Sequence, residues 1–365
     1  MPDAIWIDRA ADLPPLAALL AAPDWIGLDT EFLRERTFFP KLCLLQLAAA
    51  GNIWCIDTLS GSSLEPLVPA LTAAPCRKVI HAARQDLEAF YLTSRRIIAP
   101  VFDTQVAAAC IGLKPQIGYA ELVKVLLNVT LAKGQTRTDW SKRPLSPEQL
   151  DYAAEDVMYL EELARRLTER LRALGREHWV AEDCAALEEP DLYEPDPERA
   201  WMKLRGLAQL QPEPRSRAKA IAIWRERTAR ERDLPRSWIV PDAAIFDAAQ
   251  RNPTSVAALK ALREVPSTLN ETFARGMLEA LRAPPAVALA DEEPSQDLRP
   301  TPEQKAMIER LNKAVDLKAA ELGVSAEVLA PRGEIKALAL GKRELPSLAG
   351  WRRREIGESL LASLG

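Results

Sequence analysis

Short apolar runs separated by turn-forming residues dominate the first 80 positions of the chain. Runs of this length, bounded by glycine, proline and polar residues, are typical of β-strands. They cover residues 4–8, 25–32, 41–49, 52–59 and 77–81. The middle three runs are joined by connections so short that they predict an antiparallel meander. The pattern then becomes mostly helical, which predicts an α/β domain with a mixed sheet and helices on its faces.

Two acidic, proline-rich segments interrupt the helical part of the chain. This composition is typical of linkers, and the segments are residues 188–198 and 284–300. We therefore predict an α/β domain over residues 1–187, followed by two small all-helical domains over residues 199–283 and 301–365.

The composition is that of a globular protein with two or three domains. Of 365 residues, 48% are hydrophobic and 27% are charged, and no run approaches the ~20 apolar residues of a membrane span. The five cysteines are odd in number and form no Cys-x-x-Cys pair, which argues against a disulfide framework or a zinc site. We therefore expect a cytoplasmic protein without membrane contact and, because no coiled-coil repeat suggests assembly, a monomer.

The net charge of −4 conceals an uneven distribution of charged residues. Residues 1–198 are acidic, residues 199–283 are basic, and the remainder is nearly neutral. An acidic catalytic part followed by a basic part suits an enzyme whose polyanionic substrate is held by an accessory domain. A solvated helical surface would also be basic, so charge alone leaves both interpretations open.

Two carboxylates, Asp29 and Glu31, stand two residues apart within the apolar run WIGLDTEF. Side chains at this spacing point to the same face of a strand. Their mutual repulsion favours a cation between them, most simply a divalent metal ion. Asp86 lies near the start of a predicted helix, shortly after a strand that ends near His81, and could supply a further ligand.

A later predicted helix carries Tyr152 and Asp156, which are four residues apart and share one helix face. Glu155 points about 100° away around the same helix and is excluded from the candidate set. Asp57 and Asp103 lie in the same domain but outside these segments, and Asp103 is placed to cap a helix. The candidate site therefore combines two strand acids, one acid at a helix start, and a helical tyrosine and aspartate.

In this order, the three segments resemble the exonuclease motifs of the DEDD superfamily, in its tyrosine-bearing subclass. The runs KLCLLQLA and TRTDWSKRPLSPEQLDYAAEDVMYL are similar to ribonuclease D, and this resemblance extends from about residue 20 to residue 285. It implies a ribonuclease H-like fold for residues 1–187. Residues 199–283 resemble an HRDC domain, and residues 301–365 would form a second, more diverged HRDC-like domain.

The resemblance implies a 3′–5′ exoribonuclease that releases 5′-mononucleotides from RNA with a free 3′ end, with transfer RNA precursors as the expected substrate. It implies two divalent ions, Mg²⁺ or Mn²⁺, because carboxylate oxygens favour hard cations. Asp29, Glu31 and Asp156 would hold one ion, and Asp29 with Asp86 a second ion about 3.5–4 Å away. Tyr152 would orient the attacking water, since its unperturbed pKa of about 10 makes it a poor base.

The long polar loop before the Tyr152 helix is where we expect substrate contacts. Long loops in compact domains are usually functional or disordered, and this loop carries Arg137, Lys142 and Arg143, which would meet phosphates. A solvated basic loop is the alternative interpretation. His81 is included among the substrate-contacting candidates, although its place at a strand end favours a hydrogen-bonding role near the site.

Two alternative functions stay open on the sequence. A DNA 3′–5′ exonuclease of repair or proofreading shares the same chemistry. Contacts to the 2′-OH would distinguish RNA from DNA, and the sequence does not show whether a residue makes them. A non-catalytic nucleic-acid-binding scaffold is the other. Such a scaffold would normally have lost a ligand residue, whereas all five motif positions are filled here.

Overall fold

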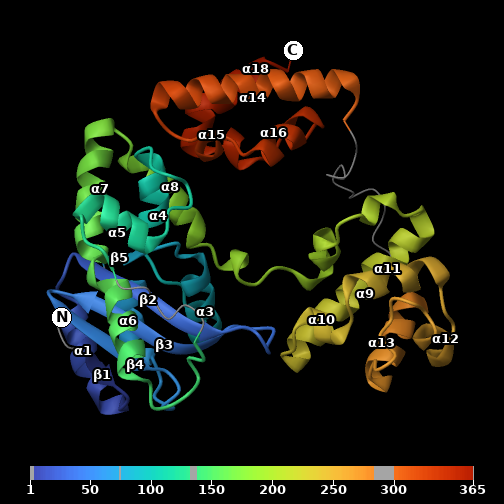
Figure 1. The fold of residues 1–365 in the computed structure, drawn as a ribbon, viewed down its shortest axis with the longest axis horizontal. Helices are drawn as coiled ribbons and strands as arrows, with labels where there is room; N and C mark the ends of the chain where they lie inside the picture. Colours follow the sequence, from blue (N-terminus) through green and yellow to red (C-terminus); the bar gives the residue numbers. More distant parts are fainter. Residues whose placement is uncertain (1–3, 74, 132–137, 283–299, 365) are drawn as a thin grey trace. The chain divides into compact units, whose positions relative to one another are not determined.

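The computed structural model describes residues 4–73, 75–131, 138–282 and 300–364 (Figure 1). The chain divides into two compact units. The first contains residues 1–33, 40–193 and 301–365, and the second contains residues 34–39 and 194–300. Among the described helices, none is both long enough and apolar enough to cross a membrane.

A six-stranded mixed sheet forms the centre of the first unit. The strands are β1 (Ile5–Ile7), β2 (Trp25–Leu33), β3 (Lys41–Ala49), β4 (Asn52–Asp57), β5 (Arg77–Ile80) and β6 (Val101–Asp103). Their order is β1-β4-β3-β2-β5-β6. Strands β2, β3 and β4 form the predicted antiparallel meander, and β1, β5 and β6 are added in parallel. The mixed sheet is confirmed, but the short strand β6 was not predicted, because three residues are too few for a recognisable pattern.

Helices cover both faces of this sheet. They are α1 (Leu13–Leu20), α2 (Val68–Thr72), α3 (Arg84–Ser94), α4 (Thr104–Cys110), α5 (Tyr119–Leu127), α6 (Pro147–Met158), α7 (Leu160–Leu174) and α8 (Glu177–Leu187). Alternation along β2 sends Ile26 and Leu28 into one core with α1 and α3. The opposite face of the sheet packs against α6 and α7, so each face has its own apolar layer.

Gly27 allows the junction of α6 and α7 to lie directly against the sheet. A Cβ atom at this position would stand 3.2 Å from the carbonyl oxygen of Val157 and 3.2 Å from the Cβ of Leu160. Only glycine leaves this space, and the close approach sets the height of α6 above β2. The α6 side chains that face the sheet therefore come close to the strand residues that follow Gly27.

The C-terminal helices belong to the same unit. They are α14 (Pro302–Leu322), α15 (Ala326–Leu329), α16 (Arg332–Ala339), α17 (Gly350–Arg352) and α18 (Glu358–Ala362). Their apolar side chains join the core that contains α4, α7 and α8. The ring of Trp351 stacks on that of Trp179 in α8, with centroids 4.0 Å apart and planes 10° apart. The C-terminal segment is thus packed on the α/β part as one body.

The second unit is helical and has a separate core. Its helices are α9 (Pro212–Arg232), α10 (Arg236–Ile239), α11 (Asp242–Arg251), α12 (Val256–Lys260) and α13 (Glu271–Arg282). Apolar residues of α9, α11 and α13 form that core. The backbone amides of Phe38 and Phe39 both donate to Asp233, at 3.0 Å. These contacts explain why residues 34–39 group with this unit.

Candidate active site

Strand β2 places Asp29 and Glu31 on the face that packs against α6. The antiparallel register pairs Asp29 with Gln46 and Glu31 with Leu44 on β3. The register shifts immediately afterwards, between Glu31 and Phe32, and interruptions such as β-bulges often occur beside active sites. The two strand acids therefore lie on the same face of the sheet, as their spacing predicted.

Helix α6 brings Asp156 to the same place. Its start is fixed by a capping box, in which Ser146 and Gln149 bond to each other's backbone amides, and by Pro147 in the first turn. One carboxylate oxygen from each of Asp29, Glu31 and Asp156 lies within 4.8 Å of the others. The structure thus brings Asp156 next to Asp29 and Glu31, which lie in a distant part of the sequence.

Asp86, in the first turn of α3, lies near enough to these acids to repel the charge of Asp29, although it is not one of the three whose oxygens lie within 4.8 Å of one another. The pairing of β2 with β5 ends at Gly27 and Val79, so Thr30 lies beyond the end of this parallel ladder. Asp86 Oδ1 accepts hydrogen bonds from the Thr30 amide at 3.1 Å and from the Thr30 hydroxyl at 2.6 Å. Asp86 is only 6% exposed, so these two bonds hold a nearly buried carboxylate beside the strand acids.

Burial and mutual repulsion raise the pKa of all four acids. Burial is the main cause in each case, and it raises the pKa of Glu31 to about 8 and that of Asp86 to about 7. The pKa of Asp156 also rises to about 7, and that of Asp29 rises well above its usual range because Asp86, Asp156 and Glu31 repel its charge. One buried and three partly buried carboxyls need positive charge nearby to be ionised together. An all-oxygen donor set of this kind fits a hard divalent cation.

Tyr152 lies on α6 one turn before Asp156, and its hydroxyl is near enough to the Asp156 carboxylate to lower the pKa of that acid. Burial, followed by the charge of Asp156, raises the pKa of Tyr152. The tyrosine therefore keeps its proton near neutral pH and serves as a hydrogen-bonding group. Its ring lies beside that of Trp140, with centroids 6.1 Å apart, and Trp140 is itself 4% exposed.

His81 is engaged within the protein through both ring nitrogens. Nε2 lies 3.0 Å from the carbonyl oxygen of Ile117, and Nδ1 lies 2.8 Å from the Thr104 hydroxyl. Burial lowers the pKa of His81, which favours the neutral ring. A carbonyl can only accept, so Nε2 carries the proton and Thr104 donates to Nδ1. This geometry gives His81 a structural role beside the site.

Of the three predicted phosphate contacts, Arg143 is placed differently from the expectation. Its guanidinium donates twice to Asp57, at 2.6 and 2.8 Å, and also to the carbonyl oxygens of Cys43 and Trp140 at 2.8 Å. With these donors used, Arg143 anchors the loop before α6 to the sheet instead of facing a phosphate. Lys142 is exposed, with its ammonium 3.9 Å from Asp139. Arg137 lies outside the described residues.

Two acids outside the motif positions have structural roles. Asp103 caps α4 by accepting from the amides of Gln105 and Val106, as predicted. Asp57, which ends β4, was not expected to matter, yet it is the partner of Arg143. No local pattern links two residues 86 positions apart, so sequence inspection had no signal for this pair.

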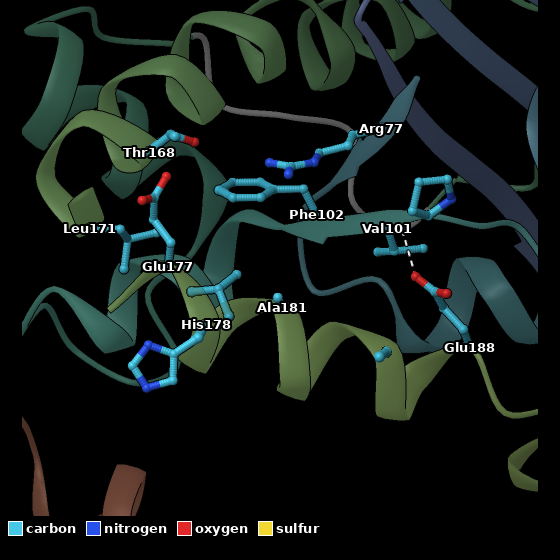
Figure 2. Close-up of a pocket in the computed structure, with 12 residues that line it drawn as sticks. Arg77, Val101, Phe102, Thr168, Leu171, Glu177, His178, Ala181 and Glu188 are labelled. Atoms are coloured by element: carbon cyan, nitrogen blue, oxygen red, sulfur yellow. Dashed lines mark hydrogen bonds between the residues drawn. The ribbon is translucent and has the colours of Figure 1, made fainter. Parts of the chain in front are cut away.

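A pocket of about 390 Å³ lies elsewhere in the first unit (Figure 2). It is lined by Arg77 at the start of β5 and by Phe102 of β6, and Figure 2 shows Glu188 bonded to the amide of Val101 across it. It contains none of the predicted site residues. In sheets with parallel strands, ligands usually bind at the carboxyl ends of the strands, which is where Asp86 lies, whereas this pocket contains the first residues of β5 and β6.

Comparisons with known proteins agree on the chain's relatives. A family model described as 3′-5′ exonuclease matches residues 4–172, and an HRDC domain model matches residues 215–281. The ribonuclease D of Gluconacetobacter diazotrophicus is 38% identical over 99% of this chain and 93% of its own length. That of Acidiphilium cryptum is 37% identical, over 100% of this chain and 94% of its own length.

Solved structures give the same result. The crystal structure of Escherichia coli RNase D, described as an exoribonuclease involved in structured RNA processing, matches with a TM-score of 0.88 and 28% identity. The match covers 99% of this chain and 98% of that one. The catalytic core of RRP6 from Trypanosoma brucei, at 24% identity and a TM-score of 0.63, shares the fold over 77% of this chain.

Proposed function

Because this chain belongs to the ribonuclease D family and is a 3′–5′ exoribonuclease, we propose that its acidic cluster is the catalytic centre. The catalytic residues are Asp29, Glu31, Asp86, Tyr152 and Asp156. The observation that carries this proposal is the approach of three carboxylate oxygens to within 4.8 Å of one another. Partly buried acids at that spacing repel one another, and a bound cation would relieve this repulsion.

The family depends on divalent metal ions, and we propose Mg²⁺ or Mn²⁺ for this chain. Asp29, Glu31 and Asp156 would hold one ion, and Asp29 together with Asp86 would hold a second. Bound divalent ions would make the attacking water more acidic and stabilise charge on the leaving 3′ oxygen. Thr30 contributes by fixing one oxygen of Asp86, which leaves the other oxygen for this task.

The Tyr152 hydroxyl positions the attacking water. Its proton would point to Asp156, whose pKa it lowers, so its oxygen would accept a hydrogen bond from the water and direct a water lone pair towards the phosphorus atom. Trp140 holds the tyrosine ring from the side. Because burial raises the pKa of Tyr152, removal of the water proton does not fall to the tyrosine.

We propose RNA with a free 3′ end as the substrate and transfer RNA precursors as its natural source. This is supported by the E. coli relative, whose description names structured RNA processing. The basic residues of the HRDC region, 199–283, would hold the RNA backbone, and Lys142 would add a phosphate contact at the loop. We also propose that the protein releases 5′-mononucleotides and that it is a cytoplasmic monomer.

The test is hydrolysis of a 5′-labelled single-stranded RNA, beside DNA of the same sequence, in Mg²⁺, Mn²⁺ or EDTA. We expect a ladder that shortens from the 3′ end of RNA, requires metal, and disappears in Asp29→Asn. Glu155→Gln is the matched control, because Glu155 neighbours Asp156 on α6 but lies outside the cluster, and it should retain near-normal activity. Faster cutting of DNA would identify a DNA exonuclease, and no cutting of either substrate would favour a binding scaffold.

A further inference from the structure

Gln46 is a fully buried polar residue at the centre of the first unit. It lies on β3 and is 0% exposed. Neither its Oε1 nor its Nε2 atom has a hydrogen-bond partner in the structure. Buried amides are almost always paired in folded proteins, and an unpaired one calls for an explanation such as a functional role or a missing ion or water. The segment that contains it, KLCLLQLA, follows the first exonuclease motif after residues 33–40.

The sheet register places Gln46 beside the metal site. Asp29 of β2 and Cys55 of β4 are its direct partners on the two neighbouring strands. Residues directly opposite each other share a face, with Cβ atoms about 4.5–5.5 Å apart. Cys55 offers only a weak hydrogen-bonding thiol, so Asp29 is the strong acceptor next to this amide.

Helix α6 closes this face of the sheet. Ala153 of α6 packs in one cluster with Leu44 and Cys55. Leu44 lies two positions before Gln46 on β3, and Cys55 lies opposite Gln46 on β4. The amide is therefore enclosed by apolar groups on its other sides. Of the two side chains directly opposite Gln46, only that of Asp29 is a strong acceptor, so it is the partner that a small rotation of either side chain would give the amide.

We propose that Gln46 is a positioning residue of the metal site, whose side-chain amide donates a hydrogen bond to the Asp29 carboxylate when Asp29 holds a divalent cation. The inference rests on the proposed metal site. An ionised carboxylate has about four lone-pair positions, more than its metal contacts use. A hydrogen bond to one of them fixes the carboxylate's orientation, as outer partners of metal ligands commonly do. A neutral amide does this without competing with the cation for charge, whereas a lysine would.

The test is Mn²⁺ binding to the full chain, measured by isothermal titration calorimetry without RNA. Gln46→Met keeps the length of the side chain and removes its polar atoms. We expect it to bind Mn²⁺ about tenfold more weakly or worse, the range seen for lost outer partners. We expect the melting temperature of the metal-free protein to stay equal or rise, because the removed amide had no partner there. A residue needed only for packing would show the reverse pattern.

The matched control is Leu47→Met, on the same strand and also 0% exposed, but facing the opposite core. It should keep the Mn²⁺ affinity of the unaltered chain. Gln46→Asn provides a second reading, because it retains a buried amide but is one methylene too short for Asp29, and it should also bind weakly.

Unchanged Mn²⁺ affinity in Gln46→Met would overturn the inference, as would an equal loss in Leu47→Met. If Gln46→Met fails to fold, unchanged affinity in Gln46→Asn would overturn it, and so would failure of both variants to fold. If the unaltered chain binds no Mn²⁺, the proposed metal site itself is wrong. That result is distinguishable, because it appears before any variant is compared.

Discussion

Two helical regions follow the exonuclease motifs, and they relate to the rest of the chain in different ways. Residues 194–300 build their own core from α9, α11 and α13. Residues 301–365 instead complete the core of the α/β part, where Trp351 stacks on Trp179 and Arg352 forms a two-bond ion pair with Asp183. Similar helical patterns in sequence thus produce one self-contained unit and one segment that belongs to another unit's core.

This difference changes the expected result of truncation. From the sequence, residues 199–283 and the more diverged residues 301–365 were expected to form two helical domains separate from the exonuclease domain. The shared core instead implies that the C-terminal helices help to hold the catalytic unit together. The HRDC region, with its separate core, is the part that can be weakened without loss of the active-site fold.

The largest effect should come from deleting residues 301–365. This exposes the faces of α4, α7 and α8 that the C-terminal helices cover, and we expect the first unit to lose more than ~5 kcal/mol, most of a typical domain's stability. Aggregation or loss of the cooperative thermal transition, together with loss of RNA hydrolysis, would be seen by calorimetry and by the labelled-RNA assay. A shortened chain that melts normally and cuts RNA at the usual rate would break the comparison.

A single side chain tests the same contact more gently. Trp351→Ala removes a 1% exposed ring and its stacking on Trp179, and should lower the free energy of unfolding of the first unit by about 3–5 kcal/mol in urea titration. Trp238→Ala is the control, because Trp238 is 56% exposed in the second unit and should change stability by less than ~0.5 kcal/mol. Equal effects of the two substitutions would show that the stacked pair is dispensable.

Four of the five proposed catalytic residues could be picked out because each pair shares one face of a strand or a helix. Asp29 and Glu31 are two positions apart on a strand and therefore share one face. Tyr152 and Asp156 are four positions apart on a helix and also share one face. Asp86 was found through the resemblance of its segment to an exonuclease motif. Its hydrogen bonds to Thr30 depend on where β5 ends, which no local pattern marks.

Apart from the short strand β6, the features that sequence inspection missed are long-range. Arg143 was assigned to phosphate because its loop is basic, but its partner Asp57 lies 86 positions earlier on β4. The shared core was missed for the same reason, since apolar periodicity shows that a helix has a buried face without showing what covers it. Charge and periodicity describe an element, and only the tertiary structure supplies its partner.

The independence of the second unit can be tested by a cavity in its core. Ile245→Ala empties space around a 0% exposed side chain of α11 and should destabilise this unit by about 2–4 kcal/mol. We expect calorimetry to show only the second unit's transition shifted, and short RNA oligomers to be cut at the normal rate. Affinity for long RNA, and its dependence on salt, should fall as the basic surface is lost. A matching shift in both transitions would mean that the two units unfold together.

The smallest effect concerns the ion pair between Arg143 and Asp57, which anchors the loop before α6 to the sheet. Arg352 and Asp183 connect the C-terminal helices to α8 in the same way. Burial alone would raise the pKa of Asp57, but the hydrogen bonds from Arg143 and from the Leu59 amide outweigh burial and lower it. A group whose pKa is lower in the folded state stabilises the fold fully above its unfolded pKa of about 3.9 and loses this contribution as pH falls through the folded value. The stability lost in Asp57→Asn, measured in urea titrations, should therefore be constant from about pH 7 to pH 5 and shrink towards pH 3. Glu162→Gln is the control, because Glu162 pairs with Arg165 on the exposed side of α7 and such pairs contribute little to stability. An equal pH dependence of stability in both variants would show that the pair of Asp57 and Arg143 behaves as a surface pair.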